Sequence, residues 1–221
     1  MDDVPIVSIR ESYDQLAEEY ANHLFQELEN KPFDRDLLDR FASGVSGQIC
    51  DMGCGPGHVA RYLRDAGVTV FGLDLSPQML DQARQRNPDI RFREGNMLSL
   101  DLEESSLGGI TAFYAIVNLP PESWPLVFRE MERVLQPNGL LLLAFHTGDE
   151  VVEVKKLWEQ PVSLNFFFVA VAVAKRHLET AGFRIEEVLE RGPYSPEVES
   201  QTQRAYIFAR KQCAAPSGLA S

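Results

Sequence analysis

A turn of three alternating glycines after an apolar segment constrains this chain more than any other feature of its sequence. Residues 49–57 read Ile-Cys-Asp-Met-Gly-Cys-Gly-Pro-Gly, and a second apolar segment, residues 69–74, ends in Asp74. Glycine lacks Cβ, so it adopts backbone angles that are closed to other residues and lets a ligand approach the main chain closely. The pattern predicts two strands of an open parallel sheet joined by a helix, with a ligand at the carboxyl ends of the strands.

The same residues indicate a ligand that contains ribose but no phosphate. Asp74 offers two acceptor oxygens, which suit the hydroxyls of a ribose. In a dinucleotide fingerprint the pyrophosphate binds backbone N–H groups, but here the third glycine comes one residue early and Pro56 has no N–H. The pattern therefore favours S-adenosylmethionine as the cofactor, and an NAD-dependent oxidoreductase is the weaker alternative.

Residues 49–57, 70–75, 92–97 and 135–146 together resemble the motifs of class I S-adenosylmethionine-dependent methyltransferases, of the small single-domain type. The resemblance covers roughly residues 10–211. It implies an α/β fold with a doubly wound, Rossmann-like, mostly parallel seven-stranded sheet, an antiparallel C-terminal strand and an N-terminal helical lid. It also implies an enzyme that moves a methyl group from S-adenosylmethionine to a small-molecule acceptor.

The resemblance further assigns roles to residues of the cofactor site. Asp74 would bind the ribose hydroxyls, Leu75 would pack on the adenine, and Asp51 would fix the glycine loop. Asn96 stands where such enzymes usually carry an aspartate that accepts a bond from the adenine amino group, and an amide oxygen also accepts such a bond. The expected cofactor-binding residues are Tyr13, Tyr20, Asp51, Gly53, Cys54, Gly55, Asp74, Leu75, Met79, Asn96, Met97 and Tyr114.

The sequence patterns divide the chain into three parts. We expect an N-terminal helical cap over residues 1–42, a cofactor-binding core over 43–211 and a flexible tail over 212–221. Apolar residues repeat at helical spacing over residues 13–28, and Pro32 separates this helix from a shorter one.

Within the core, strand and helix signals alternate, as a parallel α/β sheet requires. Residues 147–168 are expected to form a substrate-side insertion. Residues 170–181 predict a helix, although the alternating valines there also fit a strand. By resemblance, the last two strands form an antiparallel hairpin. The other expected elements are strands at residues 48–52, 69–74, 90–94, 110–117, 140–146, 183–189 and 205–209, and helices at 58–65, 77–86 and 121–135.

Composition argues against nucleic acid and membranes as partners. The 33 acidic and 21 basic residues give a formal charge of −12, which repels phosphate backbones. The longest apolar run, residues 166–174, is shorter than the roughly 20 residues of a membrane-spanning helix. The N-terminus lacks the basic start and apolar stretch of a signal peptide, and three cysteines do not suit a disulfide framework. We therefore expect a cytoplasmic monomer or homodimer.

Methyl transfer requires a base only when the acceptor must lose a proton. His146 is the candidate catalytic base because it ends the predicted strand 140–146 and has a near-neutral ordinary pKa. A structural histidine at the strand end is the alternative, as is a non-catalytic cofactor-binding scaffold or sensor for the whole chain. We identify no metal site. Candidates for the acceptor pocket are Trp124, Trp158, Phe166, Phe167, Phe168, Tyr194, Arg204 and Tyr206.

Overall fold

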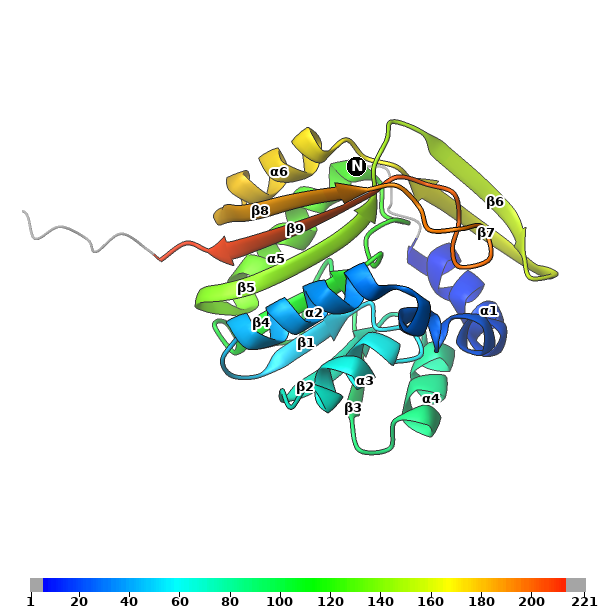
Figure 1. Ribbon diagram of the computed structural model, residues 1–221, viewed down its shortest axis with the longest axis horizontal. Helices are drawn as coiled ribbons and strands as arrows, with labels where there is room; N and C mark the ends of the chain where they lie inside the picture. Colours follow the sequence, from blue (N-terminus) through cyan, green and yellow to red (C-terminus); the bar gives the residue numbers. More distant parts are fainter. Residues whose placement is uncertain (1–5, 214–221) are drawn as a thin grey trace, which may run out of the picture.

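The computed structural model describes residues 6–213, and a seven-stranded sheet with the order β3-β2-β1-β4-β5-β9-β8 forms its centre (Figure 1). Strands β1 to β5 run parallel, and β9 is antiparallel to both of its neighbours. This arrangement confirms the predicted doubly wound sheet and its antiparallel C-terminal strand. The strands are β1 (Ile49–Met52), β2 (Val70–Asp74), β3 (Arg91–Glu94), β4 (Leu107–Phe113), β5 (Leu135–His146), β8 (Phe183–Arg191) and β9 (Arg204–Lys211).

Helices cover both faces of the sheet. Helices α2, α3 and α4 lie on one face and α5 and α6 on the other, whereas α1 lies beyond the carboxyl ends of the parallel strands (Figure 1). No helix in the described part of the chain is long and apolar enough to cross a bilayer. The helices are α1 (Ile6–Leu24), α2 (Pro32–Gly44), α3 (His58–Asp65), α4 (Pro77–Arg86), α5 (Trp124–Val134) and α6 (Val171–Thr180), with 3-10 turns at Glu27–Asn30 and Pro121–Ser123.

Strand β5 shows how the sheet supports a core on each face. Its side chains alternate, so that Leu141, Leu143 and Phe145 pack in the core with α5 and α6. Leu140 and its even-numbered neighbours pack in the core with α2, α3 and α4. A strand buried on both faces reads as a continuous apolar run, which is why the sequence pattern here predicts a central strand.

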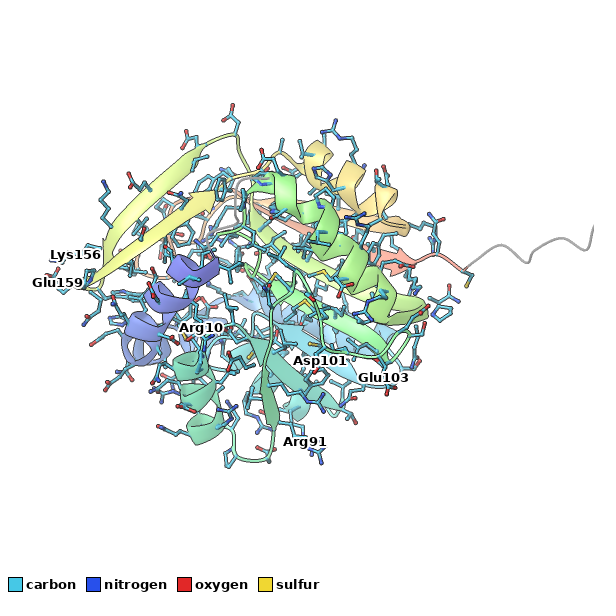
Figure 2. All side chains as sticks on the ribbon, turned by 180° about the vertical axis from the view of Figure 1, so that it is seen from behind. Arg10, Arg91, Asp101, Glu103, Lys156 and Glu159 are labelled. Carbon is cyan, nitrogen blue, oxygen red and sulfur yellow. The ribbon has the colours of Figure 1, made fainter. Side chains whose placement is uncertain are left out.

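Residues 147–168, expected to be an insertion, contain a separate two-stranded sheet, β6 (Val151–Leu157) and β7 (Gln160–Phe167). Figure 2 shows Lys156 and Glu159 at the tip of this hairpin, which extends alongside α1. The Ser163 amide donates to Ser12 Oγ at 3.0 Å, and Ser8 Oγ donates to the Ser163 carbonyl at the same distance. The hairpin is therefore bonded to the N-terminal helix.

Several predicted boundaries are wrong by a few residues. Helix α1 begins at Ile6 and ends at Leu24, earlier at both ends than the predicted 13–28. Strand β4 ends at Phe113, not at residue 117, because Tyr114 takes a φ of 53° and the chain turns there. Residues 170–181 contain helix α6, so the helical prediction is confirmed over the strand alternative. Most of the predicted tail lies outside the described residues.

Gly72, in the middle of β2, lies so close to neighbouring side chains that it leaves no room for a Cβ. A Cβ at this position would lie 2.5 Å from Cδ1 of Phe92 and 2.7 Å from Sγ of Cys54. We expect Gly72→Ala to lower the free energy of unfolding by about 1–3 kcal/mol, as overpacked cores do. Urea unfolding measures the change. In the control Gly44→Ala the nearest side-chain atom is 3.4 Å away, and equal midpoints for both variants would contradict the prediction.

Candidate functional site

The site lies where the strand order reverses. Strand β1 pairs with β2 on one side and with β4 on the other, so the loops after β1 and β4 diverge and leave a crevice. The two loops still approach closely at its base, because a Cβ on Gly53 would lie 2.5 Å from Cβ of Ala115. Gly53 also has a φ of 70°. Only glycine combines this backbone angle with this close approach.

Asp51 fixes the glycine loop from inside the protein. One of its carboxylate oxygens accepts from the Ala60 amide at the start of α3, and the other accepts from Thr111 Oγ1 on β4, both at 3.0 Å. Burial raises the pKa of the Asp51 carboxyl to about 6. The carboxylate thus joins the two sides of the crevice below the ligand space.

Asp74 ends β2 and faces the crevice. Its Oδ2 accepts from the Gly55 amide at 2.8 Å, and its Oδ1 accepts from the Ser76 amide at 2.9 Å. Burial raises the pKa of Asp74, whereas these two amides favour the charged form. Each carboxylate oxygen has a further lone pair, so the side chain can accept two more hydrogen bonds from a diol.

A cavity of about 720 Å³, including its open mouth, lies between these loops and α1. Pockets for small molecules span about 300–1,000 Å³. Asp74 is the only charged side chain among the described lining residues. These are Ile6, Ile9, Tyr13, Tyr20, Gly53, Gly55, Leu73, Asp74, Leu75, Met79, Gly95, Asn96, Met97, Phe113, Tyr114, Ala115, Asn118 and Leu119.

Helix α1 covers the cavity and is bonded to the elements around it. The Tyr13 hydroxyl donates to Asn118 Oδ1 at 2.7 Å, and Asn118 Nδ2 donates to the Asn165 carbonyl of β7 at 2.9 Å. Arg10, labelled in Figure 2, pairs with Glu94 at the end of β3 at 3.1 Å. The helix is therefore attached to both the sheet and the hairpin.

Ten of the twelve predicted cofactor residues line this cavity. The exceptions are Asp51, which lies beneath the loop, and Cys54, which is buried against Gly72. The binding roles of all twelve residues stay predictions. Sequence reasoning missed Ile6 and Ile9, although they extend the apolar spacing of Tyr13 toward the N-terminus. It also missed six lining residues at strand ends: Leu73, Gly95, Phe113, Ala115, Asn118 and Leu119.

The predicted base, His146, lies beside the cavity and is not among its lining residues. Its ring centroid is 4.9 Å from that of Tyr114, and its Nδ1 is 2.9 Å from Thr202 Oγ1. Burial, with the charges of Arg204 and Lys31, lowers the pKa of His146 to about 4. The imidazole is therefore neutral at neutral pH and weakly basic, and its catalytic role stays a prediction.

None of the eight residues predicted for the acceptor pocket lines the cavity. Trp124 is fully buried in the core and donates from Nε1 to the Leu119 carbonyl at 3.1 Å. Trp158 instead stacks on His23 of α1, with ring centroids 4.6 Å apart. Within residues 6–213, no three His, Cys, Asp or Glu side chains are grouped so that they could hold a metal ion.

The low pKa of His146 has a measurable consequence. We expect its ring signals in NMR spectra to show a neutral imidazole down to pH 5 and a titration midpoint near 4. Because the unfolded chain binds this proton near pH 6.5 and the folded chain does not, this residue's contribution to stability rises between pH 4 and 6.5. A midpoint at the ordinary value would contradict the prediction.

Comparisons with known proteins agree with this geometry. The model of a methyltransferase domain family matches residues 49–139, which contain the glycine loop and Asp74. The malonyl-[acyl-carrier protein] O-methyltransferase of Pectobacterium atrosepticum is 32% identical over 136 residues, which cover 62% of this chain and 53% of that protein. The chain spans 53–60% of the length of three such curated relatives.

Solved structures with the same fold include an S-adenosylmethionine-dependent methyltransferase from Methanosarcina mazei. It is 16% identical with a TM-score of 0.69, and the match covers 76% of this chain and 93% of that one. The [4+2]-cyclase SpnF is 18% identical with a TM-score of 0.65, over 92% of this chain and 98% of that one. These likenesses concern the fold alone. The family model shows a methyltransferase domain over residues 49–139 of this chain, and the curated relatives that match it are named as methyltransferases.

Proposed function

We propose that the protein binds S-adenosylmethionine in the cavity below α1 and transfers its methyl group to a small-molecule acceptor. The observation that carries this proposal is the cavity itself. It has a carboxylate with spare acceptor capacity beside a glycine loop, and its other described lining residues are uncharged. S-Adenosylmethionine supplies a methyl group on a positively charged sulfur.

The residues present suit this cofactor. Asp74 can accept from both ribose hydroxyls while it holds the loop amides. Leu75 and Met97 offer apolar surface to the adenine. Asn96 Oδ1 accepts from the Leu98 amide at 2.9 Å and has one lone pair left for the adenine amino group. The glycine loop leaves space for the amino acid part of the ligand.

The same lining argues against a dinucleotide. A pyrophosphate requires cationic side chains or free amides. The described lining residues include no Lys or Arg, and the amide of Gly55 already donates to Asp74. The alternative of an NAD-dependent oxidoreductase therefore lacks the groups that it requires.

The chain's own residues would act by positioning reactants and excluding water, which accounts for much of the acceleration in such transfers. Helix α1 provides the cover through Tyr13. The curated relatives differ in the acceptor that their names give, a malonyl-[acyl-carrier protein] in one and demethylmenaquinone in another, and they support methyl transfer without a shared acceptor. The free, buried thiols of Cys50 and Cys54 support a cytoplasmic location. The net charge argues against nucleic acid, and we expect a monomer or homodimer.

Changing Asp74 tests the binding site. We expect Asp74→Asn to weaken S-adenosylmethionine binding by about 1–3 kcal/mol, because an amide replaces one acceptor oxygen with a donor. Isothermal calorimetry measures this change, with NAD as the competing ligand. Asp81→Asn, an exposed change on α4, is the matched control. Tight binding of NAD alone, or equal affinities in both variants, would contradict the proposal.

Turnover distinguishes an enzyme from a non-catalytic scaffold or sensor. The protein is incubated with methyl-labelled S-adenosylmethionine and a metabolite extract, and methylated products are identified by mass. We expect a product that depends on Asp74. Cofactor binding without any labelled product would favour the scaffold.

A further inference from the structure

A chain of three hydrogen-bonded polar groups leads from the cavity into the core. The hydroxyl of Tyr114, a lining residue, is 3.1 Å from the hydroxyl of Tyr206. Tyr206 is fully buried and donates to Oδ1 of Asp34 at 2.9 Å. The other oxygen of Asp34 accepts from Arg191 at 2.8 Å. We name Tyr114, Tyr206 and Asp34 the relay.

The direction of the hydrogen bonds in the relay follows from counting protons. A carboxylate only accepts, and a tyrosine hydroxyl has one proton to donate. Since Tyr206 gives its proton to Asp34, the bond between the two tyrosines must be donated by Tyr114. The Tyr114 oxygen then has lone pairs and no free proton, so toward the cavity it can only accept.

The backbone at Tyr114 is held in an unusual conformation. Its φ of 53° is an outlier for a bulky residue, and such strain is concentrated at functional sites. The Tyr114 amide donates to the Ala144 carbonyl at 2.9 Å, which fixes this conformation at the end of β4. Burial and the nearby Asp34 raise the pKa of the Tyr114 hydroxyl, so the phenol stays protonated.

No cationic side chain is among the described residues that line the cavity, which include no Lys, Arg or His. Two largely buried cations close to Tyr206 and Tyr114 are already paired, Arg191 with Asp34 and Arg204 with Glu199. Lys31 pairs with Glu27 at 2.5 Å. A carboxylate in the cavity would therefore find no cationic side chain to pair with, and only the sulfonium of the cofactor would offset its charge.

From these observations we propose that the methyl acceptor is a hydroxyl, amine or thiol whose own proton is donated to the Tyr114 oxygen. This inference rests on the proposed function and specifies its substrate class. The proposed acceptor differs from that of the curated relatives named malonyl-[acyl-carrier protein] O-methyltransferase, whose name describes O-methylation of a malonyl group. Tyr114 is the catalytic residue of the proposal, and Tyr206 and Asp34 are positioning residues.

The proposed methyl transfer conserves electrons and protons, and the relay takes up the proton that the acceptor loses. A lone pair of the acceptor atom forms the new bond to the methyl carbon, the carbon–sulfur bond breaks, and its electron pair stays on sulfur. The acceptor proton moves to Tyr114, the Tyr114 proton to Tyr206, and the Tyr206 proton to Asp34. The shift runs back when the product has left and water in the cavity takes the proton.

The relay can be tested without a substrate, by NMR on protein with ¹³Cζ-labelled tyrosine. We expect Asp34→Asn and Tyr206→Phe each to move the Tyr114 signal, which Tyr114→Phe assigns. The control Asp39→Asn should move only the signal of Tyr62, whose hydroxyl donates to Asp39. A Tyr114 signal that is unchanged in both relay variants would overturn the relay.

The acceptor class is tested by turnover with ¹³C-methyl S-adenosylmethionine. We expect the products in a metabolite extract to be ethers, amines or thioethers, and malonyl-coenzyme A to stay unmethylated. Tyr206→Phe should lower the initial rate by about 10-fold or more, because positioned proton transfer contributes about 10²–10⁴-fold. Its affinity for the cofactor should not change. Tyr62→Phe, which removes a hydroxyl that donates to Asp39 outside the relay and the cavity, should keep the rate.

The outcomes separate the two proposals. A methyl ester product, or methylation of malonyl-coenzyme A, would overturn the acceptor class and leave the proposed function intact. A rate that falls in His146→Ala and not in Tyr206→Phe would assign the proton to the imidazole and overturn the relay's role. No product in the unaltered protein would overturn both proposals, whereas the NMR result on the hydrogen-bond direction would stand.

Discussion

The close approach of two loops at the centre of the sheet is the constraint on which the rest of the site depends. The chain leaving β1 passes so near the chain leaving β4 that position 53 must lack a side chain. Asp51 holds both chains from below, through Ala60 and Thr111. A charged group buried in this way is tolerated only because each oxygen has a hydrogen-bond partner. The floor of the cavity is therefore set by the backbone, and side chains are left to select the ligand.

The fold and most of the predicted cavity lining could be predicted from the sequence because both rest on local signals. The predicted helices at residues 58–65 and 77–86 match α3 and α4 in full, since glycine, proline and a serine cap mark their ends. The glycine loop and Asp74 were likewise identified from spacing alone. The predicted strand at residues 110–117 begins three residues later than β4, because the low β-propensity of Gly108 and Gly109 hides the start of the strand.

The surroundings of His146, of the predicted acceptor residues and of the relay could not be predicted in the same way, because they depend on contacts between distant segments. The sequence places His146 at a strand end. It does not show that burial, and next the charge of Arg204, lower the pKa of this side chain. Trp124 is an aromatic residue of the kind that often lines pockets, but in this structure it is fully buried in the core. The relay joins Asp34 and Tyr206, which are 172 positions apart, and no local pattern announces such a bond. The type of a residue indicates which chemistry its side chain can perform, but tertiary packing determines whether that side chain lies in the cavity or in the core.

The roof of the cavity has a consequence for the order in which the molecule assembles. Its bonds join Ser8 and Ser12 to Ser163, across separations of 155 and 151 positions. Contacts that span most of a chain form slowly, since a long loop must close first. During synthesis on a ribosome, the residues of α1 and of the glycine loop emerge before Ser163, so the bonds between α1 and the hairpin form after them. Until then contacts with the sheet and α4, such as those of Arg10 with Glu94 and Asp14 with Ser76, hold α1 over the cavity.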